Sequence, residues 1–248
     1  MTWQARPVQP SGGPEETAAT GDVIHLLFCA DPSYFQHLAV AACSVASSNR
    51  RVALTIHLLT RQRDAAQERR LAESLAPFRN VSYTIYLVDD DRVSRAHVHS
   101  HYAPEVYLRL LAPEILPAGL ERVLYLDSDL IVLDDLLPLW RTDLRGHAVG
   151  AAPDFPWDPL GTEIQRHTAL GIVPGSVYVN TGVLLMDLVR WRRADLSARL
   201  FDYIAKRGPE LLFVDQDALN AVLHGDIKVL DPRWNLQARM YRLGRRRT

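Results

Sequence analysis

Two aspartates one residue apart, Asp127 and Asp129, stand between two apolar runs. In an extended chain, side chains i and i+2 point to the same side, about 6.5 Å apart along the strand. Two carboxylates placed in this way can share a divalent cation and the diphosphate that the cation holds. The alternative is a pair of solvated turn carboxylates. The apolar flanks argue against a surface turn, and burying two unpaired carboxylates costs free energy. We therefore predict a metal site at Asp127 and Asp129.

Polar residues interrupt apolar runs at two further places. Asp31 ends the first such run, where a nucleotide is expected if the run is a strand of an open α/β sheet. Its alternative role is the N-cap of the following helix. Asn180-Thr181-Gly182 lies inside a strand-like run, and a glycine there often marks a close approach of the backbone to a ligand. A β-bulge is the alternative.

Asp215-Gln216-Asp217 opens a predicted helix. One carboxylate is expected to cap the helix and the others can serve a function, although capping is the better interpretation of this tripeptide alone. The alternating His97, His99 and His101 lack an accompanying cysteine or carboxylate cluster, so we expect a polar loop at His97 and His99. Arg109 is predicted on a helix, where a surface ion pair is the alternative to a functional role.

The elements that must position these residues alternate between strands and helices in the first half of the chain. Three apolar, β-branched runs are typical of buried parallel strands, and two segments between them have helical spacing. This order predicts right-handed crossovers and a doubly wound sheet. The segments are Val23–Ala30, Tyr34–Ser47, Val52–Thr60, Asp64–Leu75 and Val81–Val88.

The second half is less regular but continues the same alternation. Predicted strands are Val123–Leu126, Ala148–Ala152, Val177–Met186 and Ile227–Leu230. Predicted helices are Glu105–Leu111, Leu136–Trp140, Asp195–Arg207 and Gln216–Leu223. The fold class is therefore α/β, with a mixed, mostly parallel sheet and helices on both faces.

The amino-acid composition limits which binding partners and which cellular compartment are expected. The chain has 248 residues, 48% of them hydrophobic and 23% charged, and a formal net charge of −1. Without a basic field, nucleic acid is not an expected partner. Cys29 and Cys43 lie in apolar segments, which favours buried thiols in a reducing compartment. No apolar run is long enough for a membrane span, and no signal-peptide pattern opens the chain, so a cytoplasmic location is expected.

Both ends differ in composition from the middle. Residues 1–21 are rich in Pro, Gly, Ala and Thr without periodicity, which predicts a flexible lead-in. Residues 22–238 form the predicted domain. Residues 239–248 form a basic tail that contains Arg245-Arg246-Arg247. An anionic membrane surface attracts basic residues. One expectation for the tail is therefore weak peripheral association with the inner face of a membrane. A solvated, frayed end is the equally weighted alternative.

Four motifs in this order resemble glycosyltransferase family 8, the retaining family that includes lipopolysaccharide galactosyl- and glucosyltransferases and glycogenin. The resemblance extends over about 23–235. It rests on Phe28-Cys29-Ala30-Asp31, on the run Val123 to Asp129, on the run Asn180 to Leu188 with Trp191, and on the run Asp215 to Asn220.

The resemblance implies a single nucleotide-sugar-binding domain of the GT-A type, with a UDP-hexose donor, Mn²⁺ or Mg²⁺, and a glycan or lipid-linked saccharide acceptor. For the donor, it implies that Asp31 contacts uridine with Tyr34 near the base; Ser33 stands where relatives often have Asn. It further implies that Asp127, Ser128 and Asp129 form the metal and diphosphate motif, that Arg109 lies near the donor, and that Asn180, Thr181 and Gly182 form the loop over it.

For the reaction, the resemblance implies that Asp154 lies beside the transferred sugar and His101 on the acceptor side. Asp215 and Gln216 match the pair at the sugar ring and the anomeric carbon. The acceptor hydroxyl is expected to attack from the face that the diphosphate leaves, which retains the anomeric configuration. Gln216 is too weak a nucleophile to predict a covalent intermediate.

One family feature has no counterpart. The family completes its metal site with a downstream histidine in a segment like His-x-x-Gly-x-x-Lys-Pro-Trp, and no histidine follows His224. The alternative expectation is therefore a truncated or impaired homologue that binds a nucleotide-sugar with little turnover. A second rival is a metal-dependent phosphohydrolase, which needs a lysine near the phosphate. The only lysines are Lys206 and Lys228, on a predicted helix face and in a late strand.

Overall fold

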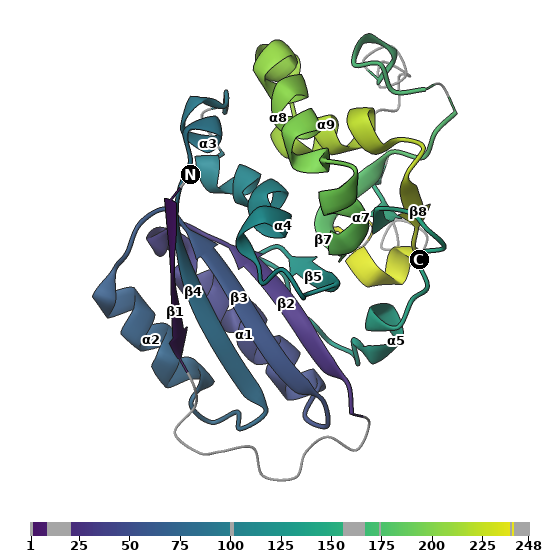
Figure 1. Cartoon of the computed structure of the whole chain (residues 1–248). Coiled ribbons are helices and arrows are strands. Elements are labelled where there is room, and N and C mark those ends of the chain that lie inside the picture. The colour runs from purple at the N-terminus through teal and green to yellow at the C-terminus, as the bar shows by residue number, and fades with distance from the viewer. Residues whose placement is uncertain are drawn as a thin grey trace.

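A computed structural model describes residues 2–8, 21–99, 102–155, 167–173, 175–238 and 240. Within these residues, eight strands form one sheet in the order β1-β4-β3-β2-β5-β7-β6-β8 (Figure 1). The strands are β1 Thr2–Val8, β2 Val23–Cys29, β3 Ala53–Thr60, β4 Val81–Asp89, β5 Arg122–Leu126, β6 Val149–Pro153, β7 Val179–Asp187 and β8 Ile227–Val229.

The sheet is mixed, as the sequence predicts. Four pairings are parallel: β2 with β3, β3 with β4, β2 with β5, and β6 with β8. Three are antiparallel: β1 with β4, β5 with β7, and β6 with β7. The chain moves outward from β2 through β3 and β4, and then returns to pair β5 with the other side of β2. In open α/β sheets, such a reversal of strand order opens a ligand crevice at the carboxyl ends of the strands.

Helices cover both faces of the sheet. The α-helices are α1 Phe35–Ser48, α2 Ala65–Leu75, α3 Asp91–Arg95, α4 Ala112–Ile115, α5 Leu137–Trp140, α7 Leu188–Arg193, α8 Leu196–Arg207 and α9 Val214–Leu223. The 3₁₀ helices are η1 Pro32–Tyr34, η2 Pro104–Leu111, η3 Gly208–Glu210 and η4 Pro232–Asn235.

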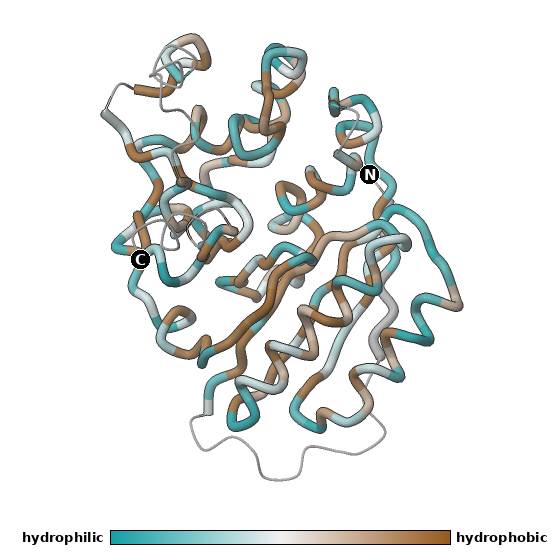
Figure 2. Tube along the Cα trace, turned by 180° about the vertical axis from the view of Figure 1, so that it is seen from behind, coloured by the Kyte–Doolittle hydropathy of each residue, from teal (hydrophilic) through white to brown (hydrophobic). Residues whose placement is uncertain are grey.

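Alternation along the central strands divides the core into two clusters. Leu26 and Phe28 of β2 pack in one cluster with α1 and α2, whereas Leu27 packs in the other with η2, α8 and α9. In β5, Leu124 belongs to the first cluster and Tyr125 to the second. Figure 2 shows hydrophobic residues running along these central strands. Continuous apolar strands are expected where helices bury both faces of a sheet.

Residues 2–8 differ from the prediction of a flexible lead-in over residues 1–21. Thr2–Val8 forms β1, which pairs antiparallel with β4 from Thr2 opposite Asp89 to Val8 opposite Tyr83. Without β1, the outer edge of β4 would expose unpaired backbone N–H and C=O groups. Pairing with a distant strand satisfies these groups and leaves no local periodic signal. Residues 9–20 lie outside the described residues, as does the predicted basic tail except for residue 240.

Several other elements also differ in detail. The predicted helix at Glu105–Leu111 is the 3₁₀ helix η2, which begins at Pro104. The predicted strand that contains Asn180-Thr181-Gly182 continues through it as β7. Its pairing with β6 is irregular at this place, because Ala151 pairs with Leu184 and Pro153 with Val179, so the extra residues lie in β7, where the β-bulge alternative expects an irregularity. In the described part of the chain, no helix combines the length and apolarity that crossing a membrane requires.

Candidate functional site

A cleft of about 670 Å³ opens at the carboxyl ends of β2 and β5. Every predicted site residue that the structure describes lines this cleft: Asp31, Ser33, Tyr34, Arg109, Asp127, Ser128, Asp129, Asp154, Asn180, Thr181, Gly182, Asp215 and Gln216. His101 lies outside the described residues, so its predicted acceptor role stays a prediction.

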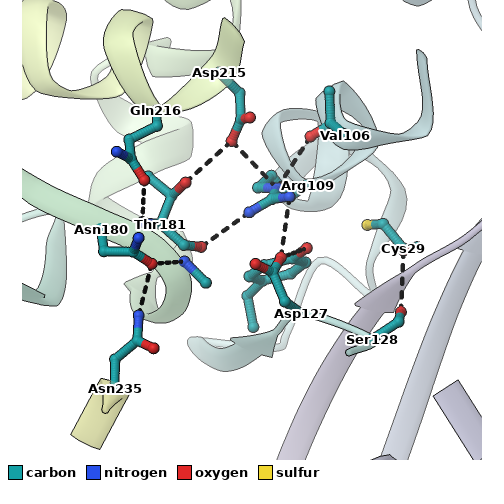
Figure 3. Close-up of polar contacts among 12 residues, drawn as sticks. Cys29, Val106, Arg109, Asp127, Ser128, Asn180, Thr181, Asp215, Gln216 and Asn235 are labelled. Carbon is teal, nitrogen blue, oxygen red and sulfur yellow. Dashed lines mark hydrogen bonds and ion pairs between the residues drawn. The ribbon is translucent and has the colours of Figure 1, made fainter. Parts of the chain in front are cut away.

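Arg109 lies between two of the cleft's carboxylates (Figure 3). Its Nη2 is 3.2 Å from Asp127 Oδ1 and its Nε is 3.3 Å from Asp215 Oδ2. Nη1 donates to the Thr181 carbonyl oxygen at 2.9 Å, and the guanidinium lies 4.1 Å from the centre of the Tyr125 ring. The residue is only 5% exposed. The alternative of a surface ion pair is therefore wrong.

Burial and charge act in opposite directions on this group of side chains. Burial lowers the pKa of Arg109, but the Asp215 and Asp127 carboxylates outweigh it and raise the pKa above the ordinary value. Burial raises the pKa of Asp215 to about 6, against the opposing charge of Arg109. Arg109 thus stays charged and compensates carboxylates that are costly to bury alone.

Asp127 is held in place from three sides. Tyr125 Oη donates to Asp127 Oδ1 at 2.6 Å, beside the contact with Arg109. The Asp127 backbone N–H donates to the Gly182 carbonyl at 2.8 Å, which continues the pairing of β5 with β7. A Cβ at Gly182 would lie 2.8 Å from Asp127 Oδ2. A side chain at Gly182 would therefore fill the space next to this oxygen.

The donor set at Asp127 and Asp129 suits a divalent cation. Burial and the neighbouring Asp127 charge raise the pKa of Asp129, which is the direction expected for carboxylates facing each other without a cation. Hard cations prefer carboxylate oxygens. Within the described part of the chain, no group of three or more His, Cys, Asp or Glu is arranged to hold a metal ion. These two aspartates fit as part of a ligand set.

A hydrogen-bond network fixes the opposite wall of the cleft. Gln216 Nε2 donates to Asp154 Oδ2 at 3.1 Å, and Gln216 Oε1 accepts from the Thr181 N–H at 3.1 Å. Asn180 Nδ2 donates to Asp154 Oδ1 at 3.2 Å. Asn180 Oδ1 accepts from the Gly182 N–H at 2.9 Å and from Asn235 Nδ2 at 2.7 Å. Both ends of the Gln216 and Asn180 amides are thereby engaged within the protein.

The two aspartates at the start of α9 have separate roles. Asp217 accepts from the Phe213 N–H at 3.0 Å and from Tyr178 Oη at 2.5 Å, so it fixes the first turn of the helix. Asp215 faces the cleft and pairs with Arg109. The prediction that one of these carboxylates is the N-cap is wrong, because Phe213 is the N-cap of α9 and makes no side-chain cap hydrogen bond. Asp215 remains for the site.

Asp31 caps a helix, as its alternative role predicts, and also lines the cleft. Its Oδ1 accepts from the Ser33 N–H at 2.8 Å, which caps η1, and its side chain lines the cleft. Tyr34 is 44% exposed, and its ring centre lies 4.8 Å from that of His37. Ser128 Oγ donates to the Cys29 carbonyl at 3.3 Å and joins the ends of β5 and β2.

Sequence reasoning missed Tyr125, Glu105 and Gln237, which line the cleft, and Asn235, which contacts Asn180 beside it. Tyr125 could have been found, because it precedes Asp127 by two residues and must share its face of the strand. Glu105 stands four residues before Arg109 on the same predicted helix. Gln237 Oε1 accepts from the Phe155 N–H at 3.1 Å and Nε2 donates to the Pro153 carbonyl at 3.2 Å. No local signal marks Asn235 or Gln237.

His97 and His99 lie away from this cleft. His99 Nε2 lies 2.8 Å from the Leu211 carbonyl oxygen, and His97 Cβ would be 3.0 Å from a Cβ at Gly208. Both residues therefore contact the connection between α8 and α9, in agreement with the prediction of a loop.

Comparison with known proteins places this cleft in context. The sequence profile of Glycosyl transferase family 8 matches residues 25–248. A probable galacturonosyltransferase-like 3 of Arabidopsis thaliana is 29% identical over 244 residues, which are 90% of this chain and 68% of that protein. A lipopolysaccharide 1,2-glucosyltransferase of Escherichia coli K12 is 23% identical over 216 residues, covering 87% of this chain and 63% of the relative.

Among solved structures, the galactosyltransferase LgtC in complex with donor and acceptor sugar analogues superposes with a TM-score of 0.78. The two sequences are 29% identical, and the match covers 89% of this chain and 78% of LgtC. The matching fold confirms the predicted single GT-A type domain with its mixed sheet.

Proposed function

The chain belongs to glycosyl transferase family 8, and on this premise we propose that it transfers a hexose from a UDP-sugar to a saccharide hydroxyl with retention of configuration. The observation that carries the proposal is the convergence of Asp127, Asp129 and Asp154 with Arg109 and Gln216 in one cleft. These residues come from segments that are far apart in the sequence.

We assign Asp127 and Asp129 as the residues that would hold Mn²⁺ or Mg²⁺. When bound, the cation would supply a positive charge that neutralises the departing diphosphate. Tyr125 and Arg109 fix Oδ1 of Asp127, and Gly182 leaves the space beside Oδ2 open. Preorganised carboxylates of this kind need little rearrangement when a cation binds.

The remaining residues divide between the two halves of the donor. Asp31, Ser33 and Tyr34 lie at the end of β2, where the nucleoside is expected. Asp154, Asn180 and Gln216 form the opposite wall, where the transferred hexose is expected. Asp154 accepts a hydrogen bond from each of the two amides, so one carboxylate oxygen faces each amide across this wall.

Attack from the leaving-group face explains retention without a covalent intermediate. Gln216 is a weak nucleophile, and Thr181 N–H and Asp154 already occupy its Oε1 and Nε2. Asp215 is turned toward Arg109 and Thr181. We infer that Gln216 and Asp215 orient and stabilise the sugar, and that the acceptor hydroxyl is the nucleophile.

The acceptor and the location are extensions of this proposal. The relation to a lipopolysaccharide glucosyltransferase and to LgtC supports a glycan or lipid-linked saccharide acceptor. A cytoplasmic location at the inner face of the membrane stays a prediction from the sequence. The basic tail would then attract anionic lipids at low salt. Sedimentation with anionic vesicles tests this, because binding at low salt that high salt reverses is expected, and deletion of residues 239–248 should abolish it.

Incubation with a panel of UDP-hexoses and Mn²⁺ tests the function itself. UDP release that increases with a saccharide acceptor is expected. Calorimetry of UDP in Mn²⁺ and in chelator tests the metal, and Asp129→Asn should remove most metal-dependent binding. Asp202→Asn is the matched control, because Asp202 is exposed on α8. Equal UDP affinity with and without metal would refute the metal requirement. Release of phosphate from phosphomonoesters instead of UDP would favour the phosphohydrolase class.

A further inference from the structure

Glu105 is an acidic residue on the wall of the cleft that the proposed mechanism does not use. It lies in the first turn of η2 and is only 7% exposed, yet it lines the cleft together with Asp31. η2 packs against β2 and β3, so Glu105 stands over the carboxyl ends of these two strands. A buried carboxyl at a ligand cleft needs either a cation or a proton.

No cation neutralises Glu105 at contact distance. Among the described residues, no basic side chain lies within ion-pair distance of its carboxyl. Arg61, which follows β3, acts on it only from farther away. The Arg61 guanidinium donates from Nη2 to Ser94 Oγ at 2.7 Å, and its buried Nε has no hydrogen-bond partner within the described part of the chain.

On balance, the surroundings of Glu105 raise the pKa of its carboxyl and favour the protonated form. Burial raises the pKa of Glu105, and the Asp31 carboxylate raises it further, while Arg61 and the residue's own backbone N–H oppose them. The Cys29 thiol, at the end of β2, is a weakly ionised neighbour whose own pKa is raised by burial.

A carboxylic acid at Glu105 would give the cleft a hydrogen-bond donor, and the Asp31 carboxyl, which accepts from the Ser33 N–H, lines the same cleft as an acceptor. Uracil presents an N3–H donor between two carbonyl acceptors on its pairing edge. We propose that Glu105 is a base-selecting residue, whose carboxylic acid donates to a uracil carbonyl while Asp31 accepts from N3–H. This inference rests on the proposed function, because it requires that the uridine end of the donor binds at Asp31.

The contact makes uracil recognition depend on the proton of Glu105. When Glu105 ionises, the donor is lost and a carboxylate faces the uracil carbonyl. Glu105→Gln keeps an N–H donor at every pH. Glu105→Ala removes the donor at every pH.

Calorimetric titration of UDP in Mn²⁺ from pH 5.5 to 8.5 tests the assignment. The wild type and Glu105→Gln are expected to bind UDP equally at low pH. At pH 8.5, Glu105→Gln should bind UDP about tenfold more tightly than the wild type. A change in affinity of about tenfold is the typical contribution of one hydrogen bond. Glu105→Ala should bind more weakly than Glu105→Gln throughout. Comparing variants at one pH cancels the titration of UDP and of the metal-binding aspartates.

Two controls show whether the effect of Glu105→Gln depends on the uracil base of UDP. Inorganic pyrophosphate lacks a base, so its affinity should be the same in the wild type and Glu105→Gln at each pH. Glu121→Gln changes an exposed glutamate outside the cleft and should leave the UDP profile unchanged. Circular dichroism of each variant confirms folding before titration.

The outcomes separate the two proposals. Parallel pH profiles of the wild type and Glu105→Gln, or an equal effect on pyrophosphate, overturn the role of Glu105 while leaving UDP binding intact. A wild type that binds no UDP at any pH overturns the proposed donor and this inference with it. Diverging UDP profiles with an unchanged pyrophosphate profile support both.

Discussion

Arg109 and Asp215 form a buried ion pair, with Nε of the arginine 3.3 Å from Oδ2 of the aspartate and both side chains less than one-tenth exposed. The same guanidinium reaches Asp127 and the Thr181 carbonyl. One cation therefore connects the end of β5, the strand β7 and the start of α9. These are three of the elements that form the cleft, so Arg109 supports the site structurally as well as electrostatically.

Removing this cation should destabilise the protein strongly. Arg109→Met leaves the buried Asp215 carboxylate without its cation, and breaking a buried ion pair by removing one partner costs about 3–5 kcal/mol. Arg109→Lys should lose less, because it keeps the charge but not the planar fork that contacts several acceptors. The free energy of unfolding in urea measures both changes.

Arg95→Met is the control for this prediction. Arg95 pairs with Asp91 on the surface of α3, and both side chains are about four-fifths exposed. Such pairs contribute about 0.3–0.5 kcal/mol. Equal losses in the free energy of unfolding for Arg109→Met and Arg95→Met would contradict the structural role of Arg109.

A methyl group at Gly182 should impair donor binding more than folding. Its Cβ would lie 2.8 Å from Asp127 Oδ2 and 3.0 Å from Asn180 Oδ1. Tyr125 and Arg109 hold Asp127 in place, so relief of this contact moves a proposed metal ligand. We expect Gly182→Ala to weaken UDP binding in Mn²⁺ at least tenfold, measured by calorimetry.

Gly150→Ala is the matched glycine variant. Its Cβ would lie 2.9 Å from Leu144 Cδ2, an apolar contact in the core. Overpacking a core typically costs about 1–3 kcal/mol. This variant should therefore lower the free energy of unfolding and keep UDP affinity. The opposite pattern, with Gly150→Ala losing affinity and Gly182→Ala keeping it, would contradict the assignment of the cleft.

Asn235 should affect turnover through Asn180. Its Nδ2 donates to Asn180 Oδ1 at 2.7 Å, and Asn180 in turn donates to Asp154. Asn235→Ala removes one of the two donors to Asn180 Oδ1, and Asn235→Asp places a carboxylate against it. We expect the rate of UDP release from a UDP-hexose to fall about tenfold in Asn235→Ala and further in Asn235→Asp. Unchanged rates in both would show that Asn180 needs no support.

Acid should destabilise the protein through His57. His57 Nε2 lies 3.1 Å from His25 Nδ1, and His57 Nδ1 lies 3.1 Å from Tyr86 Oη, across β2, β3 and β4. Burial, followed by the His25 charge, lowers the pKa of His57 to about 4 from its ordinary 6.5. The unfolded chain binds this proton first, so the stability present above pH 6.5 is lost as the pH falls toward 4.

At about 1.4 kcal/mol per pKa unit, the difference between the folded and unfolded pKa of His57 corresponds to a loss of about 3 kcal/mol in the free energy of unfolding. Urea unfolding at pH 7 and pH 4.5 measures the loss. His57→Gln cannot take up this proton and should lose less stability over the same range. An identical pH dependence in the wild type and His57→Gln would exclude His57 as the cause.

The sequence by itself determined the elements that local patterns encode. Apolar runs and helical spacing predicted the strands and helices from β2 to β4, because alternation and a 3.6-residue period are properties of neighbouring residues. The interruptions of apolar runs at Asp31, Asp127 and Asn180-Thr181-Gly182 predicted residues that the structure brings into one cleft. Their convergence followed from the rule that ligands bind at the carboxyl ends of parallel strands.

Only the tertiary structure decided which of these residues contact each other. The sequence left a surface ion pair open as an alternative for Arg109, because its partners Asp127 and Asp215 are distant in the sequence. Glu105 became a buried acid, and β1 became a strand, through pairing with segments that no local pattern reveals. Burial and long-range contacts fix the charge and role of a side chain. They depend on how separate elements pack, a property that residue type and spacing do not contain.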